Sequence, residues 1–236
     1  MKLIIADEIR KNYPDLRIGV VIAEQVDNKE HSEELLSYTK NKFWDFIDKY
    51  ITPQQLREHK NIQAWREIYK SFGVKPKKHK PTAEALLTRV LKQFIPKISP
   101  AVDCYLISES IHCLPIGGYD IDQIEGDITL RYSKGNEDFI GIGSDKKDTT
   151  DEGEVIYSDS KRVLTRRWNY RDCDNCKIDV DSKRIALFVE GALDVIDDSE
   201  IKETIDDISS NLKKFCKAET KTFFLGKDKN DIQILP

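Results

Sequence analysis

Long apolar runs are absent from this sequence. The longest, residues 18–23 and residues 185–189, fall far short of the ~18 residues that a membrane-spanning helix needs. The first residues reach the acidic Asp7 too early to form the apolar segment of a secretory signal. We therefore expect no membrane segment and a cytoplasmic location.

The motifs of several large enzyme classes are also absent. The chain contains no G-x-G-x-x-G, no G-x-x-x-x-G-K-[ST] and no G-x-S-x-G, which argues against nucleotide-driven chemistry and against a serine hydrolase. The pair Gly117-Gly118 lies between a proline and an aromatic residue. Such a pair fits either a tight turn or a stretch of backbone that a ligand approaches closely.

Cysteine is sparse, with five residues in 236, whereas a disulfide scaffold is short and dense in cysteine. Cys173 and Cys176 have the C-x-x-C spacing of half a zinc site or of a redox dithiol. No second pair repeats that spacing, and the motif lies in a charged, turn-prone stretch. We expect two surface thiols, no metal site and no cofactor.

Apolar and aromatic residues are nevertheless numerous enough for a core, because the chain holds 3 Trp, 9 Tyr and 9 Phe among patterned Ile, Leu and Val. Their spacing predicts a mixed α and β fold in one domain. A Ser32 cap, a Thr52-Pro53-Gln54-Gln55 capping box and a Thr82 cap mark three helix starts. Glycines punctuate the chain after Pro100, where we expect a sheet-rich half. The predicted helices are residues 31–50, residues 52–73 either unbroken or broken near Lys60-Asn61, residues 82–94 and residues 199–216. The predicted strands are residues 3–5, 16–26, 127–132, 154–157, 184–189 and 221–225.

Positive charge is concentrated in one segment of an acidic protein. The net charge is −4, yet residues 61–97 carry nine Lys or Arg against two Glu. Their centre, residues 75–81, is too rich in proline to be helical and predicts an exposed basic loop. The segment fits either a nucleic-acid contact on one face or a solvated charge run.

The segment Arg166–Asp172 holds the densest group of recognition-type side chains. As a strand, it would place Arg167, Asn169 and Arg171 on one face and Arg166, Trp168 and Tyr170 on the other. It fits either recognition of RNA and amino acid or a salt-bridged edge with Trp168 in the core.

Seven short segments, taken in order, resemble the B3/B4 domain family, which is related to the editing region of the phenylalanyl-tRNA synthetase β subunit. They are residues 64–69 (AWREIY), 72–76 (FGVKP), 81–91 (PTAEALLTRVL), 101–103 (AVD), 114–122 (LPIGGYDID), 152–157 (EGEVIY) and 167–171 (RWNYR).

The resemblance implies a single three-layer α+β domain with a mixed β core flanked by helices. Residues 61–195 would form the B3/B4-like core, residues 1–60 an N-terminal part of the same domain, and residues 196–236 a C-terminal helix and strand. It also implies a protein that binds tRNA or aminoacyl-tRNA and hydrolyses the ester of mischarged aminoacyl-tRNA in trans. A non-catalytic tRNA-binding or amino-acid-binding module is the alternative, and a plain interaction protein is a third.

The family alignment also suggests the site. The family's pocket wall corresponds to Tyr105–Ser110 and Gly117-Gly118, and a glutamate that recognises the amino acid corresponds to Glu190. Leu106 replaces an Asn of the synthetase and Gly117 replaces a His, so we expect the protein to discriminate against tyrosyl-tRNA. The candidate catalytic residues are Glu190, Gly117 and Gly118; the candidate substrate-binding residues are Tyr105, Leu106, Ser108, Trp168 and Asn169; the candidate RNA-binding residues are Lys75, Lys77, Lys78, Lys80, Arg166, Arg167 and Arg171.

Overall fold

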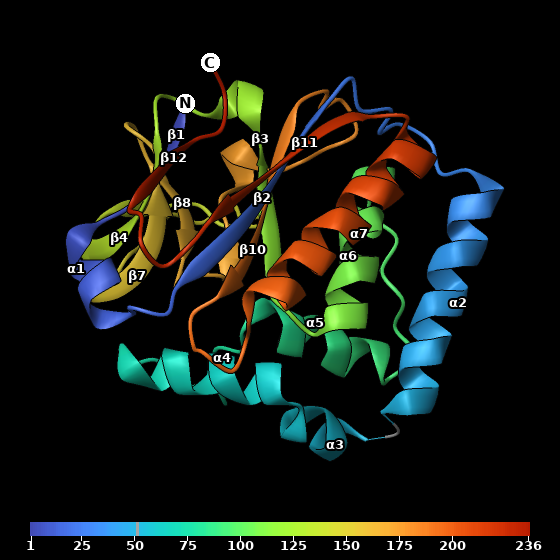
Figure 1. Ribbon diagram of the computed structural model, residues 1–236, viewed down its shortest axis with the longest axis horizontal. Helices are drawn as coiled ribbons and strands as arrows, with labels where there is room; N and C mark the ends of the chain where they lie inside the picture. Colours follow the sequence, from blue (N-terminus) through green and yellow to red (C-terminus); the bar gives the residue numbers. More distant parts are fainter. Residues whose placement is uncertain (51) are drawn as a thin grey trace.

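Two β-sheets lie face to face at the centre of the molecule (Figure 1). The structure is a computed structural model that describes residues 1–50 and 52–236. The larger sheet has the order β12 (Asp231–Gln233), β1 (Lys2–Ile5), β4 (Ile128–Lys134), β7 (Glu152–Ser158), β8 (Val163–Arg166) and β9 (Arg171–Asp172). The smaller has the order β11 (Glu219–Leu225), β2 (Arg17–Glu24), β10 (Ile185–Gly191) and β3 (Ile116–Asp120). A separate short pair joins β5 (Asp138–Phe139) and β6 (Asp148–Thr149).

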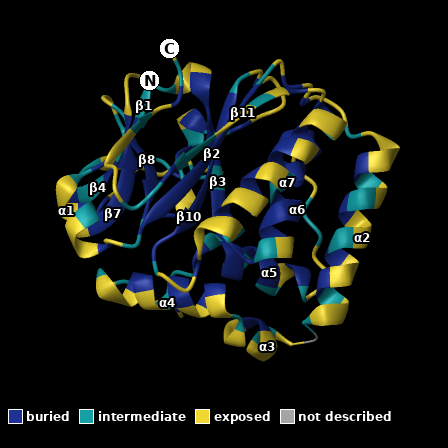
Figure 2. Cartoon of the chain, in the orientation of Figure 1, coloured by how far each residue is buried: buried dark blue, intermediate teal, exposed yellow. Residues whose placement is uncertain are grey.

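The larger sheet is mixed, because β1 runs parallel to β4 while its other pairs are antiparallel. The smaller sheet is antiparallel throughout. All seven residues of β10 are buried, as expected for a central strand covered on both faces. Figure 2 shows this buried centre, with exposed residues along the outer faces of the helices.

Helices cover the outer face of the smaller sheet and extend below it (Figure 1). The helices of the described chain are α1 (Asp7–Asn12), α2 (Glu33–Lys49), α3 (Pro53–Glu58), α4 (Lys60–Ser71), α5 (Thr82–Val90), α6 (Pro100–His112) and α7 (Asp198–Cys216). Helix α7 packs directly on β2, α6 packs on α7, and α2 packs on α6. The expected α+β domain with a mixed β core flanked by helices is therefore confirmed.

Close packing of α7 on β2 depends on a glycine. The Asp197 side chain caps the helix together with Glu200 in a capping box. A Cβ atom at Gly19 would lie only 2.6 Å from Ile205 Cγ2 and 2.8 Å from Ile201 Cγ2. The missing side chain thus lets the apolar stripe of α7 approach the strand.

Most of the predicted elements are present, and two of the three predicted helix starts are confirmed. The Ser32 side chain accepts from the Leu35 N–H, and Thr52 forms its capping box with Gln55. Thr82 was expected to cap α5, but it is the first helical residue and Pro81 precedes it without a side-chain cap. The helix also ends earlier than expected, at Val90.

The expected sheet-rich half is present, because strands β3–β12 all follow residue 112, but it starts later than Pro100, since residues 100–112 form helix α6. Ten of its thirteen residues are buried. A helix buried nearly all round has no apolar stripe, so its period cannot be recognised in the sequence.

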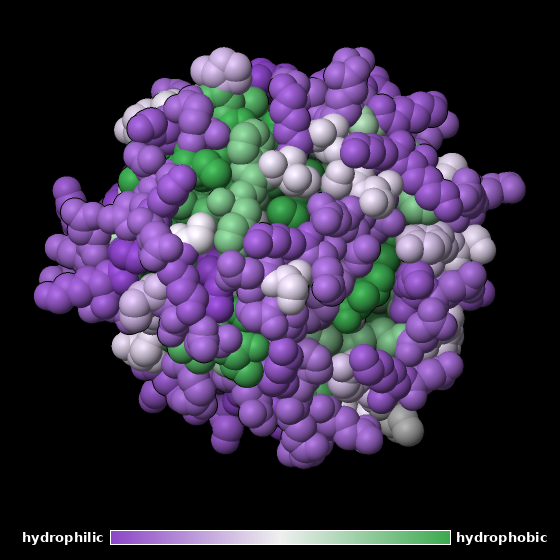
Figure 3. Space-filling model, viewed as in Figure 1, coloured by the Kyte–Doolittle hydropathy of each residue, from purple (hydrophilic) through white to green (hydrophobic). Residues whose placement is uncertain are grey.

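No helix among residues 1–50 and 52–236 is long and apolar enough to cross a bilayer. Polar and charged side chains cover most of the face seen in Figure 3, with smaller apolar patches between them.

Candidate functional site

A cavity of about 660 Å³ lies where helix α5 meets the two sheets. Its wall combines α5 and the residues that follow it with β3, β7, β8, β9, β10 and the turn between β8 and β9. This volume lies in the range of small-molecule sites, about 300–1,000 Å³. Gly117, Glu190, Trp168, Asn169 and Arg171, all predicted from the sequence, line this one cavity.

Glu190 of β10 lies at the buried end of the cavity and is 3% exposed. Its Oε1 accepts hydrogen bonds from the Tyr157 hydroxyl and from Trp168 Nε1, the latter at 2.9 Å. Its Oε2 accepts from Asn169 Nδ2 at 3.1 Å. Burial raises the pKa of Glu190 to about 7, although these three donors favour the charged form. Both oxygens of this carboxyl group are therefore held by the protein.

Further side chains fix the groups that hold Glu190. The Tyr69 hydroxyl donates to Asn169 Oδ1 at 2.8 Å, so the Asn169 amide group is oriented from both ends. The indole of Trp168 is fully buried and packs edge to face against Tyr13 at 4.8 Å and Trp65 at 5.3 Å between ring centroids. The Glu190 environment is consequently rigid.

The turn between β8 and β9 places Trp168 and Asn169. Arg167 has φ 47° and Trp168 has φ 70°, left-handed conformations that bulky residues seldom adopt. The segment is therefore not a single strand: the chain reverses here, and the alternation of faces that a strand would give does not occur. The reversal directs the indole into the core and leaves Asn169 on the cavity wall.

Arg166 and Arg167 are held by carboxylates. Arg166 is 2% exposed and pairs with Glu154 at 2.7 Å, with Asp148 and with Asp151. Arg167 pairs with Asp151 at 2.9 Å and lies 3.5 Å from Glu154. Carboxylates therefore occupy both guanidinium groups and fix the turn. The segment thus contains both a salt-bridged edge with Trp168 in the core and an Asn169 that faces the cavity.

A second carboxylate of the cavity was not predicted from the sequence. Asp172 of β9 lines the wall, and its Oδ1 accepts from the Thr165 hydroxyl at 2.5 Å. The Tyr119 hydroxyl lies 2.5 Å from the same Thr165 oxygen and completes the chain of hydrogen bonds. Burial raises the pKa of Asp172 to about 6. The charge of Asp172 in turn raises the pKa of Glu190, after the larger effect of burial.

The two glycines predicted for the site have different surroundings. A Cβ at Gly117 would lie 3.6 Å from Asp172 Oδ2, an ordinary contact, so this position opens toward the cavity. A Cβ at Gly118 would lie 2.4 Å from the Ala186 carbonyl oxygen and from Leu187 Cδ2. Gly118 allows β10 to pack closely and is not part of the described cavity wall.

The α6 residues predicted for the pocket wall lie outside the described cavity wall. Ser108 Oγ accepts from Asn211 of α7, and Leu106 is buried in the core. Tyr105 is half-buried, and burial, followed by the charge of Asp172, raises its pKa. The reason is that α6 lies among α7, α2 and the sheet, so most of its side chains pack between elements. Leu106 therefore does not supply the apolar cavity surface on which the expected discrimination against tyrosine partly depends.

Four basic residues border the cavity, and we call them the cationic rim: Lys80, Arg89, Lys92 and Arg171. Within the described residues, none of the four forms an ion pair with a carboxylate. Lys80 Nζ donates to Thr88 Oγ1, and Arg171 Nη2 donates to the Ile142 carbonyl oxygen. The sequence interpretation named Lys80 and Arg171 and missed Arg89 and Lys92.

The remaining predicted lysines, Lys75, Lys77 and Lys78, are exposed on the loop between α4 and α5 and do not line the described cavity. We refer to them as the loop lysines. They precede Lys80, a member of the cationic rim, by two to five residues along the chain.

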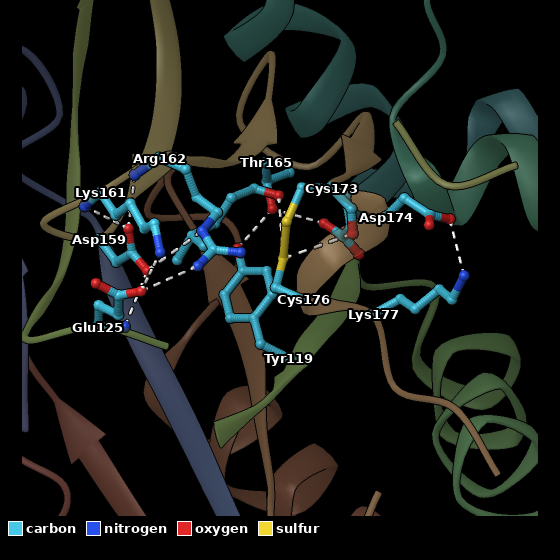
Figure 4. Close-up of a disulfide and its surroundings, with 12 residues drawn as sticks. Tyr119, Glu125, Asp159, Lys161, Arg162, Thr165, Cys173, Asp174, Cys176 and Lys177 are labelled. Atoms are coloured by element: carbon cyan, nitrogen blue, oxygen red, sulfur yellow. Dashed lines mark hydrogen bonds and ion pairs between the residues drawn. A yellow bond between two sulfur atoms is a disulfide. The ribbon is translucent and has the colours of Figure 1, made fainter. Parts of the chain in front are cut away.

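Cys173 and Cys176 form a disulfide directly after Asp172 (Figure 4). Both are buried, so the expectation of two surface thiols is wrong. The short helix of residues 174–176 folds them against β8, where the Cys173 N–H donates to the Leu164 carbonyl oxygen at 2.7 Å. The described part of the chain contains no group of three or more side chains suited to hold a metal ion.

Fold and cavity together define a single α+β domain with a ligand-sized cavity, acidic inside and basic at its border. Residues 64–220 match the B3/4 domain, and the protein therefore belongs to the B3/4 domain family, as the resemblance in its sequence predicted. No curated protein matches the chain. Among solved structures, it is similar to an N-terminal fragment of the phenylalanyl-tRNA synthetase β subunit from Pyrococcus horikoshii, with 12% identity and a TM-score of 0.47. That similarity covers 92% of this chain and 49% of the other, so the chain spans about half the length of that structure.

Proposed function

We propose that the protein binds the acceptor end of tRNA and hydrolyses the ester of mischarged aminoacyl-tRNA. One observation carries this proposal: a single cavity has at its border cations without a carboxylate partner among the described residues, and inside it two carboxyl groups, the buried Glu190 and the half-buried Asp172. The 3′ end of aminoacyl-tRNA has the complementary charges, with phosphates in the nucleotide chain and an ammonium group on the amino acid.

The cationic rim supports the RNA part of the proposal. Lysine and arginine groups that have no carboxylate partner are free to neutralise phosphates, and release of counterions then favours binding. The loop lysines, which precede Lys80 in the chain, would contact further phosphates. In this way a protein with a net charge of −4 binds RNA through one face.

The interior supports the amino-acid part. Tyr119, Tyr157, Trp168 and Phe188 provide aromatic surface in the wall, and Glu190 and Asp172 provide negative charge for an ammonium or hydroxyl group. An aminoacyl ester is already activated, so a site that orients water and substrate contributes much of the rate enhancement. The backbone N–H of Gly117 is a candidate donor for the developing oxyanion.

Hydrolysis of charged tRNA tests the proposal. The protein is incubated with tRNA charged with each proteinogenic amino acid, and release of the amino acid is followed above the spontaneous rate. We expect fast release from at least one mischarged tRNA. Retention of tRNA at low salt without any release would instead indicate the non-catalytic binding module, and absence of retention would reject the tRNA proposal altogether.

A further inference from the structure

The two carboxyl groups of the cavity differ in how their oxygens are used. Both oxygens of Glu190 accept hydrogen bonds from protein donors. In Asp172 only Oδ1 does so, from Thr165, and no donor among the described residues bonds to Oδ2. A general base needs an oxygen with a free lone pair within reach of the water that it deprotonates. Within the described chain, Asp172 Oδ2 has both lone pairs free, whereas Glu190 Oε1 already accepts two hydrogen bonds and Oε2 accepts one, so Asp172 is the more available base.

Gly117 keeps the free oxygen of Asp172 accessible. A methyl group at this position would lie 3.6 Å from Oδ2 and 3.9 Å from Oδ1, so the absence of a side chain leaves space beside the carboxylate. That space belongs to the cavity, since Gly117 and Asp172 both line it. A water molecule there would lie between the carboxylate and a bound ester.

We propose that Asp172 is the general base that activates water for ester hydrolysis, an inference that rests on the proposed deacylase function. Asp172 Oδ2 takes a proton from water as the water oxygen bonds to the ester carbonyl carbon. The resulting tetrahedral intermediate then breaks its bond to the ribose oxygen, which receives the proton from Asp172. The products are the free amino acid and a tRNA with its hydroxyl restored, so one water molecule is consumed and the carboxylate is regenerated.

The surroundings of Asp172 adjust it to this task. Thr165 on β8, hydrogen-bonded to Tyr119 of β3, holds Oδ1 and fixes the orientation of the group. Burial raises its pKa to about 6, so the group is mostly charged near neutral pH and still basic enough to take a proton. The titratable groups that face it from neighbouring elements are Tyr105 and Glu109 of α6, Tyr119 of β3, Tyr157 of β7 and Glu190 of β10.

Glu190 and Asp172 would then have separate roles. Burial raises the pKa of Glu190 to about 7, and the charge of Asp172 contributes to that rise. The hydrogen bonds from Tyr157, Trp168 and Asn169 fix the orientation of Glu190, and the lone pair left on Oε2 suits it to recognising a polar group of the amino acid. Two carboxyl groups that share one site but differ in environment commonly take different roles.

The test compares Asp172→Asn with Asp174→Asn in full-length protein. Asp174 is the matched control because it lies on the same segment, pairs with Lys177 at 2.9 Å and does not line the cavity (Figure 4). The substrate is the aminoacyl-tRNA that the wild type hydrolyses fastest. We expect Asp172→Asn to lower kcat by about 100-fold or more while tRNA binding is retained, and Asp174→Asn to match the wild type.

The pH profile gives a readout that a purely structural role would not change. In the wild type, log kcat should rise with pH up to about pH 6 and then level off, and this limb should be absent in Asp172→Asn. Gly117→Ala provides a second variant, because its added methyl group makes only ordinary contacts and retains the backbone N–H. We expect about a 10-fold loss from covering Oδ2.

The outcomes separate the two proposals. Asp172 is rejected as the base if the wild type is active and the kcat of Asp172→Asn lies within about 3-fold of the wild-type kcat, or if the variant keeps the rise of log kcat up to about pH 6. The deacylase proposal is not affected by that result. If Asp172→Asn fails to fold, as judged by thermal unfolding, full activity of Gly117→Ala rejects the base. A wild type that is inactive on every charged tRNA overturns both proposals.

Discussion

Replacing Glu190 with Gln should change how the stability of the protein depends on pH. Glu190 is 3% exposed, and burial raises its pKa from 4.5 to about 7. Below about pH 4.5 the group is protonated in both the folded and the unfolded state and has no effect on stability. Between the two pKa values the unfolded chain releases this proton while the folded protein keeps it, so the free energy of unfolding falls as pH rises.

The size of this effect follows from the two pKa values. Each tenfold difference in proton affinity corresponds to about 1.4 kcal/mol, so Glu190 lowers the free energy of unfolding by about 3 kcal/mol between pH 4.5 and pH 7. Asp172 acts in the same direction at lower pH, because burial raises its pKa from 3.8 to about 6. These two groups should therefore make the wild type less stable at neutral pH than in mildly acidic buffer.

Urea unfolding of the wild type and of Glu190→Gln, at several pH values between about 5 and 8, measures the effect. In the variant, the NH2 group of the introduced glutamine faces the NH2 group of Asn169 in place of an acceptor oxygen, which lowers the free energy of unfolding by on the order of 1 kcal/mol. This cost does not vary with pH, so it shifts the curve without changing its slope. We expect the difference in free energy between the two proteins to change by about 2–3 kcal/mol across this range. Parallel curves would refute the reasoning, since they would mean that Glu190 ionises equally easily in the folded and unfolded states.

Three further predictions follow from the site and its surroundings. Gln at all four positions of the cationic rim should reduce the slope of log K against log salt for tRNA binding by about three, because each single-stranded phosphate contact contributes about 0.7. An unchanged slope in filter binding would mean that the rim does not contact phosphates. The control variant, with Gln at the three loop lysines, removes a similar amount of charge. Tyr69→Phe leaves the buried Asn169 Oδ1 without a hydrogen-bond donor and should lower the free energy of unfolding by about 1–2 kcal/mol. The control Tyr38→Phe, at a half-buried helical tyrosine, should change that free energy by less than about 0.5 kcal/mol. Equal losses in urea unfolding would contradict the role given to the Tyr69–Asn169 hydrogen bond. Thiol titration of the protein denatured without reductant should find the three free cysteines Cys104, Cys113 and Cys216, and a count of five would show that Cys173 and Cys176 are reduced.

Much of the fold could be predicted from the sequence where the pattern is local. Capping residues mark the starts of α2 and α3, and the apolar stripe of α7 is regular. Helix α6 could not be recognised because it is buried nearly all round and has no polar face. The reversal at Arg167 and Trp168 was missed because left-handed turns are expected at glycine or asparagine rather than at large side chains.

The site was predictable only in part, for a related reason. Glu190 was found through a family motif, and its partners in the turn between β8 and β9 were found as a cluster of recognition-type residues. Asp172 lies beside the two cysteines in a charged stretch that resembles many solvated loops. Its proximity to Glu190 arises because β9 and β10 belong to different sheets that pack face to face. Packing of this kind leaves no pattern in a single sequence.

The hydrogen bond between Trp168 and Glu190 makes tryptophan fluorescence an intrinsic probe of the cavity. Only three tryptophans are present, and the Trp168 indole donates to a carboxyl group whose pKa burial raises to about 7. Its excited state will therefore experience a neutral or a negative neighbour according to pH, and a different neighbour again when an ammonium group enters the cavity. Trp65 lies 5.3 Å away, ring centroid to centroid, close enough for the two indoles to exchange excitation. Emission and near-ultraviolet circular dichroism can thus follow occupancy of the cavity without any attached label.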